Sequence, residues 1–510
     1  MLFFTSCENP WDEHVKVNDN VLEENIGNYL SSNTEFSKFN ELLVTTGMDA
    51  VLSSSVIYTV WAPTNEAINA VDPSELDTYD KMKLFVQNHI AFGNYSSKSK
   101  TGNIRLTMRS GKALNYNTSD ATIDGVTIDK EKEKVVSNGT IQVINTALTP
   151  RYSIWQYIEM KAPDCEFVSF LNSLTTKVFY PDSSEQVGVN ENGKPVYDSV
   201  WIEENYFLKY IDISSENTLF TLIIPSNEVF EAEFNKFQNY YRIEDKRNNE
   251  FPTIKDSVYT KLMIARDMAL GGKYNVTETN DTMLSFYNVK VPFKKSAVTQ
   301  SVEASNGYVH FLNDCSVKIT DKIKPILMEA ENNFYSINSN TGTPRLFRRL
   351  RDDASNGMDF ICDNAHSSQL LSGVVFAGPV VSSIKYRVKI RAVNDFGKSY
   401  ANSDTSVVLI QKLGTVTILR DPITNIIKTV SEVTNSLNYT NTAYGTADVT
   451  SDTMSVTRKA YSPLIQAEDD EIDLGYYEFN KSDNVFLRLI PLSSKMAVTA
   501  DYFRLVPIIE

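Results

Sequence analysis

The residue types that most enzymes use for catalysis are few and scattered in this 510-residue chain. It has four histidines and four cysteines, and none of the cysteines forms a C-x-x-C pair, which is unlike a zinc site. The G-x-S-x-G, H-E-x-x-H, P-loop and dinucleotide-binding motifs are all missing. We therefore expect no catalytic residue and predict that the protein is not an enzyme. One alternative stays open, because two distant carboxylates of a glycosidase site leave no mark in a sequence.

A cluster of arginines could grip an anionic ligand. Its members are Arg345, Arg348, Arg349 and Arg351. Because Asp352 and Asp353 follow directly, we interpret this cluster as a solvated, salt-bridged surface. The net charge of the whole chain is −15, and such a field would repel nucleic acid, which we exclude as a partner.

The first seven residues resemble the end of a bacterial lipoprotein signal. Met1-Leu-Phe-Phe-Thr-Ser precedes Cys7, and Glu8-Asn-Pro-Trp-Asp-Glu follows it. The basic region that usually opens such a signal is missing. The resemblance implies that Cys7 carries an N-terminal lipid and that residues 1–20 are a signal remnant and tether. It also implies an outer-membrane location facing the cell exterior, since acidic residues behind the cysteine resemble the surface-export signal of Bacteroidetes lipoproteins. A firm anchor requires more than one acyl chain.

Two segments of the chain repeat one pattern, and they must supply most of the scaffold. Residues 59–68 read T-V-W-A-P-T-N-E-A-I, and residues 221–230 read T-L-I-I-P-S-N-E-V-F. In each, a buried strand ends at a proline and a hydroxyl residue caps a helix. Later, residues 138–148 and 306–317 each begin with Asn-Gly, which predicts a hairpin turn followed by an alternating strand. Both pairs keep the same order and a similar spacing.

The paired motifs resemble the two signatures of fasciclin domains. The resemblance implies two fasciclin-like α+β domains, at residues 21–152 and 153–323, in a family that mediates adhesion and is not generally enzymatic. The first copy has Gln142 where the family prefers histidine, and the second keeps His310. We interpret His89 and His310 as hydrogen-bonded core residues. The stretches 180–200 and 236–256 are rich in turn-forming and polar residues and are candidate exposed binding loops.

The last third of the chain, residues 324–510, reads as short alternating strands separated by turns. Examples are residues 386–392, 486–490 and 502–506, and the pattern predicts an all-β jelly-roll-like sandwich. Its two ends resemble those of family-six-type carbohydrate-binding modules. That resemblance implies a structural calcium ion held by Glu329, Glu331 and Asp501, and hard oxygen ligands suit calcium. The four tryptophans all lie before residue 324, so a docking role for this domain is favoured over glycan binding.

Taken together, the sequence predicts an α+β multidomain, non-enzymatic surface lipoprotein of the Bacteroidetes kind that works by binding. The favoured setting is an accessory subunit beside a TonB-dependent outer-membrane transporter and its lid lipoprotein, where it would hold a glycan or peptide. The alternative is a free-standing adhesin that binds host matrix or neighbouring cells. The sequence does not identify the ligand-binding residues.

Overall fold

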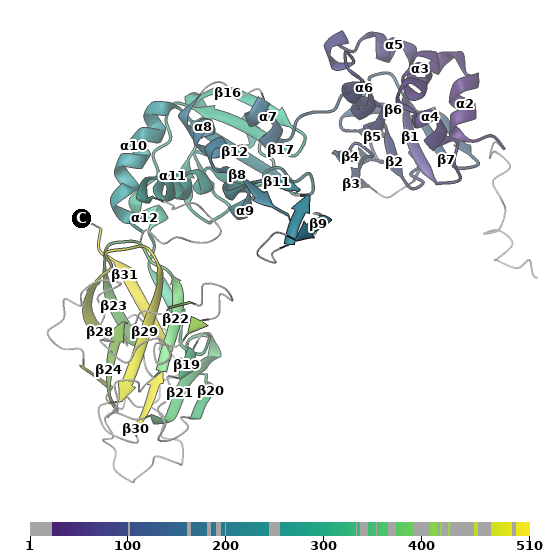
Figure 1. Ribbon diagram of the computed structural model, residues 1–510. Helices are drawn as coiled ribbons and strands as arrows, with labels where there is room; N and C mark the ends of the chain where they lie inside the picture. The colour runs from purple at the N-terminus through teal and green to yellow at the C-terminus, as the bar shows by residue number, and fades with distance from the viewer. Residues whose placement is uncertain are drawn as a thin grey trace, which may run out of the picture. The chain divides into compact units, whose positions relative to one another are not determined.

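The computed structural model describes most of the chain, as regular elements and the turns between them (Figure 1). The described residues are 23–99, 102–160, 165–180, 185–189, 195–198, 200–243, 255–332, 334–336, 345–352, 354–365, 374–391, 409–415, 419–420, 427–428, 453–456, 471–491 and 496–509. They form an α+β fold with several β-sheets in its later part, which is the predicted class.

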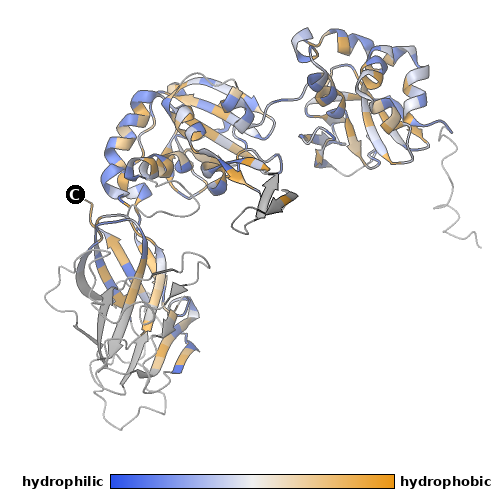
Figure 2. Cartoon of the chain, viewed as in Figure 1, coloured by the Kyte–Doolittle hydropathy of each residue, from blue (hydrophilic) through white to orange (hydrophobic). Residues whose placement is uncertain are grey.

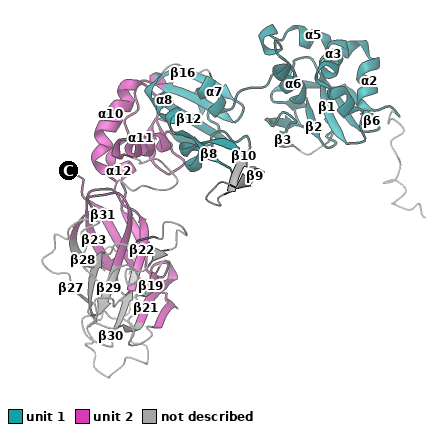
Figure 3. Cartoon of the chain, in the orientation of Figure 1, with its two compact units in different colours: residues 1–224, 269–279, 298–311 teal, residues 225–268, 280–297, 312–510 magenta. Residues whose placement is uncertain are grey.

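The chain divides into two compact units (Figure 3). Unit 1 comprises residues 1–224, 269–279 and 298–311, and unit 2 comprises residues 225–268, 280–297 and 312–510. This division passes through the second predicted domain, so the predicted boundaries near residues 152 and 323 stay predictions. We call residues 23–152 the first repeat and residues 153–323 the second repeat.

The first repeat begins with a group of short helices. Their bounds are α2 (Ile26–Ser32), η1 (Thr34–Phe36), α3 (Ser37–Thr46), α4 (Met48–Leu52), α5 (Asn65–Asn69), η2 (Pro73–Glu75) and α6 (Tyr79–Gln87). The Asn25 side chain caps α2, and Gly47 ends α3 in the left-handed conformation at φ 70°. Glycine carries no steric penalty there.

A seven-stranded sheet completes the first repeat, in the order β2-β1-β7-β6-β5-β4-β3. The central strands β1 and β7 run parallel, and β1 pairs antiparallel with β2. The bounds are β1 (Tyr58–Pro63), β2 (Ile90–Phe92), β3 (Asn103–Thr107), β4 (Ala113–Asn117), β5 (Thr122–Ile123), β6 (Val126–Val136) and β7 (Gly139–Ile144).

Both faces of strands β1 and β7 are buried, in two separate cores. Val60 and Ile141 pack with residues of the helices, whereas Trp61 and Ile144 pack with residues of the β3–β6 extension. Continuous apolar runs are typical of strands covered on both faces. Figure 2 shows the consequence, with predominantly hydrophobic central strands and helices that carry one hydrophobic and one hydrophilic side.

The part of the second repeat that lies in unit 1 contains a smaller sheet with the same neighbour order. It runs β13-β12-β17-β16, which corresponds to β2-β1-β7-β6 of the first repeat. The bounds of its elements in unit 1 are α7 (Ile154–Met160), α8 (Glu166–Ser173), β8 (Thr175–Phe179), β9 (Glu185–Val189), β10 (Pro195–Asp198), β11 (Trp201–Asn205), α9 (Tyr206–Tyr210), β12 (Phe220–Pro225), β13 (Ala269–Gly271), η5 (Val276–Glu278), β16 (Val298–Ala304) and β17 (Gly307–Leu312).

Asparagine residues at matched turns organise both repeats in the same way. The Asn138 side chain accepts from the Ile26 amide (2.8 Å) and donates to the Leu52 and Ser54 carbonyls (2.7 and 2.8 Å). The Asn306 side chain does the same for Ile154, Ile213 and Ser215. Its distances are 2.8, 2.8 and 2.9 Å. One side chain therefore ties three backbone segments together in each repeat.

The predicted Asn-Gly turn is corrected in one respect. Val136 pairs with Gly139, so the two turn residues are Ser137 and Asn138, and Gly139 already begins strand β7. Glycine is required there because a Cβ atom would lie 1.8 Å from the Tyr58 carbonyl oxygen, at φ 147°. Gly307 stands equally close to Phe220. The close approach of the parallel strand, rather than the turn, explains the glycine.

Unit 2 contains the helices and the small hairpin of the second repeat, followed by a β-sandwich. The first part comprises α10 (Asn227–Phe237), η4 (Gln238–Tyr240), α11 (Asp256–Asp267), β14 (Thr282–Leu284), β15 (Lys290–Pro292), η6 (Lys295–Ala297) and α12 (Ile319–Lys322). The Ser226 side chain caps α10 and the Thr64 side chain caps α5, as predicted.

The sandwich is built from antiparallel strands, as the alternating pattern predicted. Its main sheets run β18-β31-β23-β28 and β19-β22-β29-β24-β27, and a third runs β20-β21-β30. The bounds are β18 (Ile326–Glu329), β19 (Phe334–Ser336), β20 (Arg345–Leu350), η7 (Ser355–Gly357), β21 (Met358–Ala365), β22 (Val374–Val380), β23 (Lys385–Arg391), β24 (Leu409–Thr415), β25 (Leu419–Arg420), β26 (Ile427–Lys428), β27 (Thr453–Val456), β28 (Ile472–Glu478), β29 (Asn484–Pro491), β30 (Met496–Ala500) and β31 (Tyr502–Pro507). One core, which includes Phe360, Phe376 and Phe503, joins residues of these sheets.

Candidate functional sites

The predicted lipidation residue, Cys7, lies outside the described residues, so the lipid anchor stays a prediction. Within the described ranges, no helix is long and apolar enough to cross a membrane. Of the two predicted binding loops, residues 181–184, 190–194, 199 and 244–254 lie outside the described residues. The hairpin predicted within 180–200 is present as the antiparallel pair of β9 and β10.

The predicted calcium ligands come together where the first and last strands of the sandwich meet. Strand β18 pairs antiparallel with β31, so that Glu329 lies opposite Tyr502. The Ala330 amide donates to the Asp501 carbonyl at 2.8 Å. Glu331 and Asp501 are buried. We call Glu329, Glu331 and Asp501 the acidic cluster.

The turn at residues 355–357 forms hydrogen bonds to all three side chains of the acidic cluster. The Ser355 amide donates to both carboxylate oxygens of Asp501 (3.0 and 3.1 Å), and its hydroxyl donates to Glu329 Oε1 (2.8 Å). The Asn356 amide group lies 3.5 Å from Glu331 Oε1. Asn356 and Gly357 have φ of 54° and 72°, a conformation that asparagine and glycine tolerate. No pattern in the sequence predicted this turn.

The electrostatics of the acidic cluster are unfavourable for three ionised carboxylates. Burial raises the pKa of Asp501 to about 6 against the opposing effect of the Ser355 amide. Burial, and then the negative charges of Glu331 and Asp501, raise the pKa of Glu329. Arg391 forms an ion pair with Asp501. Arg391 is the last residue of strand β23. Nothing in the sequence distinguishes it from the other basic residues of that strand.

Two oxygen atoms of the acidic cluster lack partners. Glu329 Oε2 and Glu331 Oε2 are buried and accept no hydrogen bond from the described residues. Orphaned buried carboxylate oxygens are the kind of ligand that a hard cation takes. Within the described part of the chain, however, no three His, Cys, Asp or Glu side chains are gathered closely enough to hold a metal ion together. The calcium site therefore stays a prediction.

Arg348 and Arg349 of the arginine cluster make structural contacts, and the Arg349 ion pair is largely buried rather than solvated as predicted. Arg349 and Asp359 face each other across β20 and β21, and the Arg349 guanidinium donates to both carboxylate oxygens of Asp359 (2.9 and 2.5 Å). Arg348 donates to the Glu331 and Asn332 carbonyls. The neighbouring Asp353 lies outside the described residues. Cross-strand geometry, which the sequence does not reveal, selects Asp359.

The two histidines interpreted as core residues, His89 and His310, are structural. His89 is fully buried; its ring hydrogen-bonds to the Phe85 carbonyl (2.8 Å) and accepts from the Leu148 amide (2.9 Å). His310 is also buried and contacts the Tyr274 carbonyl (2.9 Å). Both agree with the prediction of hydrogen-bonded core residues.

A two-stranded sheet of the second repeat presents aromatic side chains to solvent. Strands β8 and β11 pair antiparallel, with Phe179 opposite Trp201 and their ring centroids 5.7 Å apart. Trp201 is 58% exposed and Tyr180 is 41% exposed. We call residues 175–180 and 200–205 the aromatic ribbon. Exposed tryptophan is rare and often marks a contact surface, but the sequence did not distinguish Trp201 from the three other tryptophans.

Comparison with known proteins identifies one family. A fasciclin-domain family model matches residues 34–150, which lie within the first repeat, and this match does not extend to the second repeat. No curated protein matches the chain.

Solved structures give more distant likenesses. One is the FAS1 domain pair of the insect cell adhesion molecule fasciclin I, with 14% identity and a TM-score of 0.22, covering 57% of this chain and 99% of that one. Another is the CBM22-1 xylan-binding domain of Paenibacillus barcinonensis Xyn10C, with 11% identity, a TM-score of 0.21, and coverage of 36% and 94%. Such modules belong to family 22, whereas the end motifs suggested family six. At these values neither likeness establishes a ligand for this chain.

Proposed function

We propose that this chain is a non-enzymatic binding protein of the cell surface, in which fasciclin-type domains form the scaffold. The single observation that carries the proposal is the fasciclin-domain match at residues 34–150. Domains of this family typically serve adhesion and binding rather than catalysis. His89 and the signature residue His310 are buried and hydrogen-bonded, which suits scaffolding.

The proposal includes a second fasciclin-like domain at residues 153–323. Its support is the internal repeat: the matched sheet order, and the matched hydrogen bonds of Asn138 and Asn306. The Thr59 hydroxyl also donates to the Gly93 carbonyl (2.9 Å), as the Thr221 hydroxyl does to Gly272 (2.8 Å). These matched contacts support a shared fold for the two repeats.

The proposal also includes a lipid on Cys7, an outer-membrane location facing outward, and a role beside a TonB-dependent transporter and its lid lipoprotein. The support is the sequence around Cys7. The bound molecule would be a glycan or peptide, and the aromatic ribbon is the candidate contact, since Trp201 and Tyr180 offer exposed rings on a folded scaffold.

A pull-down from native outer membranes in mild detergent, with a C-terminal tag on the chain, tests the proposed setting. Recovery of a stoichiometric transporter supports the accessory role, and its cargo then indicates the ligand. Recovery of the acylated protein alone at the cell surface favours the alternative, a free-standing adhesin. A Cys7→Ser variant is the control, because it should be lost from the membrane fraction. Release of sugar from a polysaccharide by the purified chain would contradict a non-enzymatic role.

A structural calcium ion at the acidic cluster is a further part of the proposal. The residues fit this role in one respect, because Glu329 Oε2 and Glu331 Oε2 are buried without hydrogen-bond partners. These two side chains would hold the ion, together with Asp501. A bound cation would compensate the charge repulsion that raises the pKa of Glu329 and would fasten the two ends of the sandwich together.

A further inference from the structure

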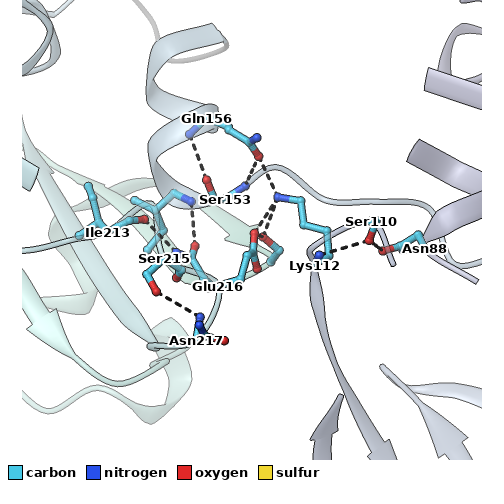
Figure 4. Close-up of polar contacts among 12 residues, drawn as sticks. Asn88, Ser110, Lys112, Ser153, Gln156, Ile213, Ser215, Glu216 and Asn217 are labelled. Carbon is cyan, nitrogen blue, oxygen red and sulfur yellow. Dashed lines mark hydrogen bonds and ion pairs between the residues drawn. The ribbon is translucent and has the colours of Figure 1, made fainter. Parts of the chain in front are cut away.

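A buried lysine of the first repeat contacts three polar groups of the second repeat. Lys112 lies directly before β4, and its Nζ atom contacts Glu216 Oε1 (2.7 Å), Gln156 Oε1 (2.8 Å) and Ser305 Oγ (3.3 Å). Figure 4 shows the Lys112 side chain pointing towards Gln156 and Glu216. Its side chain is only 7% exposed and that of Glu216 only 15%, so both charges are largely withdrawn from water.

The receiving groups are held in place by the second repeat itself. Asn306 fixes the segment before Glu216 through the Ile213 and Ser215 carbonyls. The Ser305 hydroxyl donates to Glu216 Oε1 at 2.6 Å. The Gln156 side chain accepts from the Ser153 amide at 3.0 Å. The pocket for Lys112 is therefore organised before the lysine enters it, which lowers the entropic cost of docking.

Two further basic residues join the same repeats. The Arg105 guanidinium, on β3, donates to the Glu216 carbonyl (2.9 Å) and lies 3.4 Å from the Ser305 carbonyl. Arg151, in the connecting segment, pairs with Asp124 of the first repeat (2.7 Å) and lies 3.5 Å from Glu303 of the second. Through Arg151, the segment that connects the two repeats therefore contacts an acidic residue of each repeat.

We propose that Lys112, Arg105 and Glu216 form an electrostatic lock that makes the first repeat and the part of the second repeat in unit 1 one rigid body. A buried ion pair is costly to open, since opening leaves a charge without its partner. If the segment between the repeats were flexible and the repeats did not dock, the charged groups of Lys112 and Glu216 would both remain in water. The consequence for binding is that any partner meets the two repeats at a fixed mutual orientation, which favours ligands that contact both.

Hydrogen exchange of the full-length chain tests the lock with charge reversals. Lys112→Glu should speed exchange at residues 213–217 at least tenfold, although these residues lie in the other repeat, and Glu216→Lys should speed exchange at residues 104–113. The double variant should restore most of the protection at both places. The matched control is Lys132→Glu, which breaks an exposed pair with Glu35 inside the first repeat and should leave residues 213–217 unchanged.

The proposal is overturned if Lys112→Glu changes exchange only within the first repeat, or if the double variant fails to restore protection. If the reversal unfolds the first repeat, with exchange rising throughout β1, the milder Lys112→Met variant is compared at the same peptides. Rigidity has its own measurement. Val44 and Met160, which are 58% and 63% exposed, are each replaced by a ketone-bearing amino acid that carries a spin label. The distance between the two labels should have one narrow distribution in the otherwise wild-type chain and a broad distribution in Lys112→Met. A broad distribution in the wild type would also overturn the lock.

Discussion

Gln142 and His310 show how a single position can keep its role while its residue changes. The Gln142 side chain donates to the Tyr95 carbonyl (2.7 Å) and His310 Nε2 contacts the matched Tyr274 carbonyl (2.9 Å). Each closes the loop that follows the edge strand of its sheet. A histidine in this signature therefore needs no catalytic explanation, because a neutral amide serves the same contact. Tests at single residues should accordingly report on stability.

Asn138 provides the sharpest stability prediction. Asn138→Ala leaves one buried amide and two carbonyls without their partner, and each unsatisfied buried group costs about 1–3 kcal/mol. We expect the free energy of unfolding of the first repeat to fall by at least about 3 kcal/mol, measured by hydrogen exchange along β7. Asn306→Ala should do the same to the second repeat. Asn235→Ala, on the exposed side of α10, is the control, and a loss below about 1 kcal/mol for Asn138→Ala would refute the tethering role.

His89 predicts a pH dependence of the first repeat. Burial lowers its pKa from 6.5 to about 4, so between these values the unfolded chain binds more protons than the folded one. The stabilisation of the folded state that neutral His89 provides is complete above pH 6.5 and is lost as the pH falls towards 4. The total loss in the free energy of unfolding is roughly 3 kcal/mol. His89→Gln can still accept from the Leu148 amide but does not titrate. Hydrogen exchange along β7 between pH 7 and 4.5 should show a smaller loss of stability in this variant, and equal losses would exclude His89 as the cause.

Calcium binding is tested at Glu329 and Glu331. If the ion binds, calcium at about 100 times its dissociation constant stabilises the sandwich by roughly 2.7 kcal/mol, and a chelator reverses this. The variant Glu329→Gln with Glu331→Gln should abolish the response to calcium in thermal unfolding. Glu203→Gln, an exposed acid of the aromatic ribbon, should leave the response intact. Identical melting temperatures in calcium and in chelator would mean that Ser355, Asn356 and Arg391 alone hold the acidic cluster.

At the scale of elements, a substitution in the aromatic ribbon tests ligand binding with little effect on folding stability. Trp201 is 58% exposed and packs on Phe179, a contact worth about 0.5–1.5 kcal/mol. Trp201→Ala should therefore change stability little but weaken capture of a glycan or peptide at least tenfold, measured with immobilised ligand libraries and the full chain. Val44→Ala, equally exposed on α3, is the control. Unchanged binding by Trp201→Ala would move the search away from the aromatic ribbon.

The elements also show what could be predicted from the sequence and what could not. Local signals sufficed for the strand that stops at Pro63, the cap at Thr64 and the alternating strand near Tyr386. Contacts between distant segments did not leave such signals. Arg391 reaches Asp501 across 110 positions, and the sequence offered nothing to select it. Gly139 was assigned to the turn because the adjacent strand that requires it was not visible in the sequence.

At the scale of the whole molecule, separate hydrophobic cores predict separate unfolding. The first repeat has its cores around Phe39 and Trp61, the sandwich has its own around Phe360, and these cores share no residue. Phe360→Ala removes a fully buried ring that packs on Phe334 and Phe376, which costs about 3–5 kcal/mol. Hydrogen exchange of the full chain should then show lost protection in β21 and β29 but not in β1 and β7. Phe39→Ala should give the reverse pattern. Equal loss of protection in both regions, from either variant, would mean that the chain unfolds as one cooperative unit, because regions with independent cores lose protection independently.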